Sequence, residues 1–204
     1  MISTAATSTN KPEIDDSVES RILDAALIQF AKVGVKKTTI EDIARQADVD
    51  RVTVYRRIGT RDDVVRAVMT REVESVLAEL DAIAVRTNDV HTLVADIFVT
   101  VITRWRTHPL ANRMLALEPD RVLPQLTTDG APVFTMSVAA TAATLRSAVR
   151  NGLLPDAADL DTRAEIVCRV VHSFILQPHT TVALESEDAL GVFARTYLVP
   201  IITG

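Results

Sequence analysis

Residues 50–61 bring together side chains whose chemistry suits contact with nucleic acid. Arg51 and Thr53 come first, and their N–H and O–H groups can hydrogen-bond to the edges of bases in a DNA groove. Tyr55 and Arg56 follow, with a hydroxyl and a guanidinium that can reach phosphate oxygens. The spacing of these residues therefore predicts a short basic helix that reads DNA.

The distribution of charge favours the same part of the chain. Residues 32–66 hold nine basic and six acidic residues, a net charge of +3, whereas residues 67–204 hold 11 basic and 16 acidic residues, a net charge of −5. A basic head on an acidic body is expected of a protein whose first part meets phosphates and whose second part has another task. An excess of +3 over so short a segment is also compatible with chance.

Two short helices separated by a tight turn must position these side chains. Thr38 with Glu41 predicts a capping box at the start of the first helix, and Asp50 predicts the N-cap of the second, residues 51–58. Asp48 lies between them and tolerates the left-handed backbone that such a turn needs. These parts together predict a helix-turn-helix.

The rest of the chain is predicted to be helical. Apolar spacing over residues 22–33 predicts a first helix that ends at Gly34, and Thr60 predicts the cap of a fourth helix. A break is expected at residues 87–89, and a loop is expected around Pro119, Pro124 and Gly130. The remaining helices are expected at residues 90–108, 109–118, 132–151, about 159–177, and from 186 to about 200–203. We therefore expect an all-α fold.

Residues 21–66 resemble the N-terminal domain of TetR-type (tetracycline-repressor-like) transcriptional regulators. The resemblance is carried by ILDAAL-x-x-FA-x-x-G at residues 22–34, TT-x-x-DIA at 38–44 and TVYR at 53–56. The sequence departs from the family pattern at three positions, with Asp48 where glycine is common, Val52 where glycine or alanine is common, and Ile58 where an aromatic residue is usual.

The resemblance implies a domain plan and a set of DNA contacts. Residues 1–16 are expected to be a flexible arm, residues 17–62 a three-helix DNA-binding domain, and residues 63–204 a larger helical domain for ligand binding and dimerisation. Arg51 and Thr53 are the expected base readers, and Val52 is placed to touch a thymine methyl group. The expected phosphate contacts are Thr39, Tyr55, Arg56 and Arg61. The full predicted set is Thr38, Thr39, Arg51, Val52, Thr53, Tyr55, Arg56, Arg57 and Arg61. The alternative is that Tyr55 belongs partly to the core and that Arg57 points to solvent.

A single helix in one groove makes few contacts, so two-fold pairing on a palindromic double-stranded DNA site is expected. The resemblance implies that the last two long helices form the homodimer interface. The predicted interface residues are Ile166, Val170, Phe174, Leu190, Phe193, Ala194 and Tyr197. The alternative is that these apolar faces serve only the core of their own protomer.

The resemblance also implies a small-molecule effector that binds the second domain. The predicted ligand-binding residues are Phe98, Trp105, Met114, Leu117, Phe134 and His172. Plain core packing is the alternative for each of them. Asp96 and Glu118 are able to select a cation if they are buried, although solvent is their expected environment.

Other chemistries find little support in the sequence. Glu165, Cys168 and His172 share a helical face, but a zinc site usually needs a fourth ligand, so no metal is expected. Neither a phosphate-binding glycine loop nor a nucleophile elbow occurs, so we expect no enzyme and no cofactor. The one cysteine, the lack of a signal segment and the lack of a long apolar run favour a cytoplasmic protein without a membrane partner.

The predicted function is a ligand-responsive DNA-binding transcriptional regulator. A repressor that a small apolar or amphipathic effector releases from its operator is the preferred hypothesis. Two alternatives remain open: a helical DNA-binding scaffold without an effector, and an all-helical enzyme that acts on a small molecule.

Overall fold

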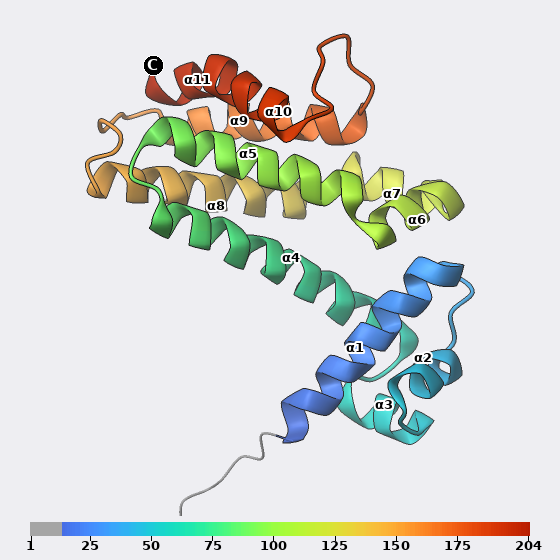
Figure 1. Cartoon of the computed structure of the whole chain (residues 1–204). Helices are drawn as coiled ribbons and strands as arrows, with labels where there is room; N and C mark the ends of the chain where they lie inside the picture. The colour runs from blue at the N-terminus through green and yellow to red at the C-terminus, as the bar shows by residue number, and fades with distance from the viewer. Residues whose placement is uncertain (1–13) are drawn as a thin grey trace, which may run out of the picture. The chain divides into compact units, whose positions relative to one another are not determined.

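The computed structural model describes residues 14–204, and the elements in this range are helices with no strand among them (Figure 1). The prediction of an all-α fold is confirmed. Residues 1–13 of the predicted arm lie outside the described range, and residues 14–16 already belong to the first helix. The helices are α1 (Ile14–Val33), α2 (Ile40–Ala47), α3 (Arg51–Arg57), α4 (Arg61–Arg86), α5 (Val90–Thr107), α6 (Pro109–Leu117), α7 (Pro119–Leu126), α8 (Ala131–Arg150), α9 (Leu160–Leu176), α10 (Glu187–Phe193), the π-helical turn η1 (Ala194–Leu198) and α11 (Val199–Thr203).

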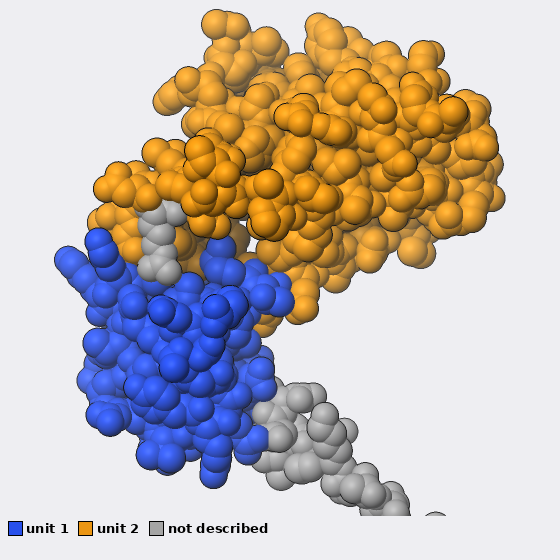
Figure 2. Space-filling model, turned by 180° about the vertical axis from the view of Figure 1, so that it is seen from behind, with its two compact units in different colours: residues 1–70 blue, residues 71–204 orange. Residues whose placement is uncertain are grey.

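The chain divides into two compact units, residues 1–70 and residues 71–204, which Figure 2 colours separately. The division falls inside α4, whereas the sequence placed the domain boundary between residues 62 and 63. The first turns of α4 therefore belong to the first unit and the remainder belongs to the second.

The first unit has its own small core. The helices α1 and α2 pack together, and Ile22 and Phe30 of α1 and Ile43 of α2 are buried. Val54 of α3 and Val64 of α4 are fully buried as well. Each of these helices is too short or too polar to be stable alone, so burial of one apolar face is what holds them together.

The core of the second unit is built around α5, which contacts α9, α10 and η1, while α8 packs along α9 (Figure 1). Phe98 of α5 is 2% exposed and has Phe193 stacked on it, with ring centroids 5.6 Å apart. Phe174 of α9 meets both rings edge-on, at 5.9 and 5.3 Å. Aromatic pairs at these separations add to the free energy of burial, so the rings join α5, α9 and α10.

One helix prediction was wrong. The expected loop after residue 118 contains α7, because Pro119 occupies the first helical position, where the missing N–H is not needed. Pro124 lies inside this eight-residue helix and removes only one intrahelical hydrogen bond. The last helical segment runs to Thr203, as expected, and includes a π-helical turn in which Val199 N–H donates to the carbonyl of Ala194.

A search of the described helices found none long and apolar enough to cross a membrane.

Candidate nucleic-acid interface

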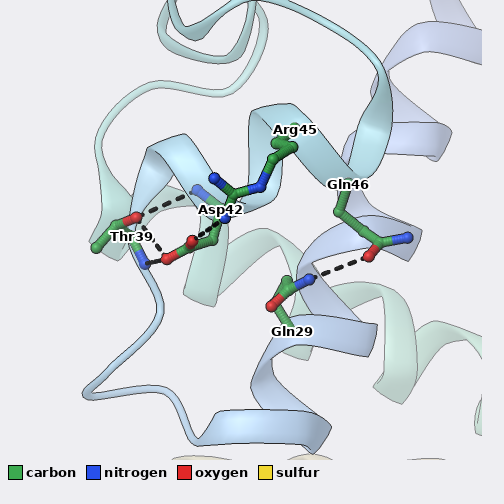
Figure 3. Close-up of polar contacts among 5 residues, drawn as sticks. All are labelled: Gln29, Thr39, Asp42, Arg45 and Gln46. Carbon is green, nitrogen blue, oxygen red and sulfur yellow. Dashed lines mark hydrogen bonds and ion pairs between the residues drawn. The ribbon is translucent and has the colours of Figure 1, made fainter.

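The start of α2 is fixed by a capping box formed by Thr39 and Asp42 (Figure 3). Asp42 N–H donates to Thr39 Oγ1 at 3.2 Å, and Thr39 N–H donates back to the carboxylate at 3.1 Å. The predicted box of Thr38 with Glu41 was wrong by one residue. Thr38 is 1% exposed, and its hydroxyl donates to the carbonyl of Gly34 at 2.8 Å, so it cannot face a DNA phosphate.

The carboxylate of Asp42 is held ionised by its neighbours. The Thr39 hydroxyl donates to it at 2.6 Å, and together with the Thr39 backbone N–H and the Arg45 guanidinium this lowers the pKa of Asp42. Arg45 reaches the same carboxylate at 2.5 Å, while Gln46, one residue on, accepts a hydrogen bond from Gln29 of α1 (Figure 3). The exposed face of α2 is therefore an ordered polar network.

The turn between α2 and α3 confirms the expectation for Asp48. This residue has φ 53° and ψ 51°, the left-handed conformation that glycine usually supplies. Arg21 of α1 supports the turn, because its guanidinium donates to the carbonyls of Ala47 and Asp48 at 2.6 and 3.1 Å.

The helix α3 begins where its N-cap was predicted. Asp50 accepts a hydrogen bond from Thr53 N–H at 2.6 Å, and this contact lowers the pKa of the Asp50 carboxyl. Val54, fully buried, anchors the inner side of the helix in the core. A short helix that is capped at one end and anchored in its middle presents its other side chains in fixed directions.

The outer side of α3 carries most of the predicted DNA contacts. Val52 is 71% exposed and Tyr55 is 51% exposed, so Tyr55 contributes only in part to the core. Arg51, Arg56 and Arg57 are exposed. This face offers donors for base edges and phosphates together with one apolar side chain for a methyl group.

A hollow of about 510 Å³ lies beside this face. Its lining includes three residues that the sequence analysis did not place in the site, namely Lys36, Ile40 and Glu41. The only signal for Lys36 was its positive charge, four residues ahead of the start of α2. Glu41 Oε2 lies 3.8 Å from Nε of Arg51. The lining residues are Lys36, Thr38, Thr39, Ile40, Glu41, Arg51, Tyr55 and Arg61.

Arg61 differs from the other predicted phosphate contacts. Its Nε donates to the carbonyl of Thr38 at 2.9 Å, and one terminal nitrogen donates to the carbonyl of Val35. Its side chain is 32% exposed, against 64% for Arg51. The guanidinium is therefore engaged with backbone oxygens of its own domain.

Of the predicted ligand residues, the structure shows one pair in direct contact in the second unit. Phe134 and His172 meet, with ring centroids 5.7 Å apart, and His172 Nε2 lies 2.7 Å from the carbonyl of Leu126. Phe98 belongs instead to the ring cluster with Phe174 and Phe193. Trp105 and Met114 are half-buried, while Leu117 is 46% exposed. None of the six lines the hollow of about 320 Å³ that is formed by residues of α4, α5 and α10 and by Arg195.

Glu118 was expected in solvent, and the structure buries it. It is 8% exposed and follows α6 directly. Asp96 is half-exposed and lies 3.7 Å from Arg86.

The predicted dimer residues separate into three groups by exposure. Leu190 and Ala194 are 2% and 0% exposed within the protomer and have almost no surface to offer a partner. Ile166 and Tyr197 are 43% and 58% exposed. The half-buried members are Val170, Phe174 and Phe193.

The three side chains considered for a metal are engaged in separate contacts. Glu165 binds Arg169 at 2.5 Å, Cys168 Sγ lies 3.3 Å from the Thr141 hydroxyl, and His172 binds a carbonyl. Burial raises the pKa of the Cys168 thiol. Within residues 14–204 the structure holds no cluster of three or more side chains suited to a metal ion.

Comparison with known proteins agrees with this geometry. Residues 22–68 match the family model for bacterial regulatory proteins of the tetR family. No match was found among curated proteins.

Solved structures extend the similarity to the whole fold. GusR of Salmonella enterica is 16% identical with a TM-score of 0.68, and the alignment covers 96% of this chain and 99% of that chain. The TetR family repressor AlkX from Dietzia sp. is 20% identical with a TM-score of 0.62, covering 90% and 94%. SmeT, solved in complex with triclosan, is 25% identical with a TM-score of 0.60, covering 90% of each chain. The match over the helix-turn-helix and the similarity of the whole fold to solved TetR-family structures support a TetR family transcriptional regulator.

Proposed function

We propose that the protein is a repressor that binds a palindromic DNA operator as a homodimer and leaves it when a small apolar or amphipathic molecule binds the second unit. DNA recognition is the part of this proposal with the most direct structural support. The effector and the dimer are supported by the chemistry of the exposed surfaces and by the related structures.

The observation that carries the proposal is the geometry of α3. Val54 anchors the helix, Asp50 caps it, and the opposite side exposes Arg51, Val52 and Tyr55. An amino-terminal helix half with exposed polar side chains is what a helix-turn-helix inserts into a major groove. In the proposal, Arg51 and Thr53 read bases, Val52 touches a thymine methyl group, and Thr39, Tyr55, Arg56 and Arg57 contact the backbone.

Pairing of two copies is proposed through α9 and the segment from α10 to α11. Ile166 and Tyr197 are the exposed apolar side chains of the predicted set, and Val192 is a further one at 56% exposure. Large exposed apolar side chains on neighbouring helices are typical of surfaces that a partner covers. Symmetric dimers are the commonest assembly, and two copies would present two recognition helices.

An effector is proposed for the second unit. AlkX is a repressor implicated in the biodegradation of n-alkanes, and SmeT has been solved with triclosan, so two proteins of this fold are connected with apolar or amphipathic molecules. The pair of Phe134 and His172, with Trp105, Met114 and Leu117, remains the proposed binding set. Phe98 would respond indirectly, through the rings that surround it.

We further propose that the effector acts through α4. This helix starts in the first unit and ends in the second, so a shift of its second part changes the spacing of the two recognition helices. Two half-sites one turn apart require a separation of about 34–36 Å. An effector needs only to bind one of the two arrangements more tightly to shift the population.

Selection of bound duplexes from a random pool tests the DNA part. We expect enrichment of an inverted repeat whose half-sites are related by one or more helical turns. A pool that stays random after several rounds at low salt would contradict it.

Titration of Trp105 emission against a panel of apolar and amphipathic ligands tests the effector part. Trp105 is the one tryptophan in the sequence, so its emission reports on one place. A ligand that both changes this emission and releases the selected duplex is expected. If no ligand releases the duplex, the alternative of a DNA-binding scaffold without an effector is favoured, and it is consistent with the close packing around Phe98.

A further inference from the structure

Two arginines from other helices, Arg61 and Arg21, bind backbone carbonyls on either side of α2. Arg61 of α4 binds the carbonyls of Val35 and Thr38, which precede α2, and Arg21 of α1 binds carbonyls at its other end. Guanidinium groups that bridge two backbone oxygens are good orienting contacts, because the planar fork of donors fixes both at once. The helix α2 is therefore tied to α1 at its end and to α4 ahead of its start.

The guanidinium of Arg61 has few N–H donors left for a phosphate, because most of its nitrogens already face protein oxygens. Its Nε and one terminal nitrogen donate to carbonyls, and the other terminal nitrogen lies 3.9 Å from the carboxylate of Asp62. A DNA phosphate at this side chain would compete with three protein oxygens. The side chain of Arg51 is twice as exposed as that of Arg61, and its Nε lies 3.8 Å from Glu41.

The carbonyls that Arg61 binds control the position of Thr39. The Thr38 carbonyl belongs to the peptide that joins Thr38 to Thr39, and the N–H of that same peptide donates to Asp42 in the capping box. The Thr38 side chain adds a third tie by donating to Gly34. A peptide held on both its oxygen and its nitrogen has one orientation, and it sets the direction of the Thr39 hydroxyl.

We propose that Arg61 is a positioning residue of the DNA-binding head and not a phosphate contact. It fixes residues 35–39 and the start of α2 to the first turn of α4. One consequence, the orientation of Thr39 toward a phosphate, rests on the proposed DNA binding. The hydrogen bonds of Arg61 to the carbonyls of Val35 and Thr38 exist without DNA. A movement of the first turn of α4 would reach α2 through these two hydrogen bonds.

Hydrogen exchange on the full chain without DNA tests the tie. The variants are Arg61→Gln, which removes the charge, and Arg61→Lys, which keeps the charge but cannot bridge two carbonyls. The amides of residues 39–43 are expected to exchange roughly tenfold faster in both variants. Arg56→Gln removes a charge from the outer face of α3 and serves as the matched control, with exchange of these amides unchanged.

The salt dependence of binding to the selected duplex separates positioning from phosphate contact. Each lost phosphate contact lowers the slope of log K against log salt by about 0.9. We expect a shallower slope by about this amount for Arg56→Gln and the wild-type slope, at weaker affinity, for Arg61→Gln. The proposal is overturned if Arg61→Gln loses slope as Arg56→Gln does while Arg61→Lys keeps wild-type exchange and affinity. If the wild-type chain binds no duplex, the proposed function fails, and the exchange rates still decide the role of Arg61.

Discussion

His108, the N-cap of α6, makes a hydrogen bond of 2.7 Å from Nε2 to the carboxylate of Glu72 in α4. Its other ring nitrogen, Nδ1, accepts from Ala111 N–H at 3.3 Å. Because Nδ1 accepts, the ring proton lies on Nε2 and donates to Glu72. Both side chains are only about one-fifth exposed, at 21% and 22%. One imidazole thus caps α6 and ties it to α4 within the second unit.

Replacement of His108 by alanine should therefore destabilise the second unit. Loss of a cap and of a shielded hydrogen bond to a carboxylate is expected to lower the free energy of unfolding by about 1–2 kcal/mol. Urea denaturation followed by circular dichroism measures the change. His179→Ala alters an exposed histidine in the segment between α9 and α10 and is the matched control. Equal stability of the two variants would show that the contact contributes nothing.

Arg51 and Arg56 should lose different properties when each is changed to alanine. Arg51→Ala is expected to relax the preference at one base position, at a loss of about 1–3 kcal/mol for the preferred base. Arg56→Ala should weaken binding to all duplexes alike and reduce the salt slope by about one contact. Anisotropy titrations against the selected duplex and its single-base variants measure both effects. Equal losses on every duplex from both variants would contradict this division of roles.

The acid stability of the first unit should depend on Asp63. The Thr60 hydroxyl and N–H donate to its carboxylate at 2.6 and 2.8 Å, and with Arg66 they lower the pKa of Asp63 from 3.8 to about 2. Because the folded pKa is the lower one, the stabilisation is complete above pH 3.8 and is lost as the pH falls toward 2. Asp63→Asn should therefore unfold more easily than wild type at pH 7, with the difference shrinking toward pH 2.

Asp62→Asn provides the control for this pH dependence, since it removes the neighbouring carboxylate and none of the contacts to Thr60. Its stability relative to wild type should change far less between pH 7 and pH 2. A constant difference between Asp63→Asn and wild type across that range would count against the capping role.

Gly59 and Gly152 should respond differently to alanine, although both have positive φ. Gly59 has φ +119°, and an added Cβ would lie 2.7 Å from Oδ2 of Asp63, the oxygen that Thr60 binds. Gly152 has φ +73°, with nothing within 4 Å of the added atom. We expect Gly59→Ala to destabilise by about 1–3 kcal/mol and Gly152→Ala by about 1 kcal/mol, measured by thermal unfolding. The reverse order would contradict the account of the α3–α4 turn.

Local chemistry was enough to predict the turn and caps of the helix-turn-helix. Asp48 in the left-handed region, Asp50 as N-cap and Gly34 after α1 each follow from the conformations that one residue type adopts. The start of α2 was misplaced because Thr38 and Thr39 both have an acidic residue three positions later. Only the burial of Thr38 and its bond to Gly34 distinguish them, and a linear pattern does not contain this information.

Long-range contacts account for the other differences. The sequence alone suggests that Arg61, a basic residue directly after Thr60, contacts a phosphate. Its hydrogen bonds to the carbonyls of Val35 and Thr38 could not be foreseen, because these residues lie more than 20 positions away in the chain. The apolar stripes of the last helices do not show which members face inward, so Leu190 was grouped with Tyr197. Residue type and period predict that a face is apolar, whereas the tertiary fold decides what covers it.

Binding of duplex DNA by the outer face of α3 is the claim on which the account depends. The most direct measurement compares wild type with a triple variant, Arg51→Ala, Val52→Ala and Tyr55→Ala, by anisotropy at low salt on the selected duplex. These side chains are exposed, and Val54 and Asp50 are retained, so circular dichroism should show the same helicity for both proteins. The account predicts that wild type binds the duplex and that the triple variant loses specific binding. Equal binding by the two proteins, or no binding by wild type to any duplex, would contradict it.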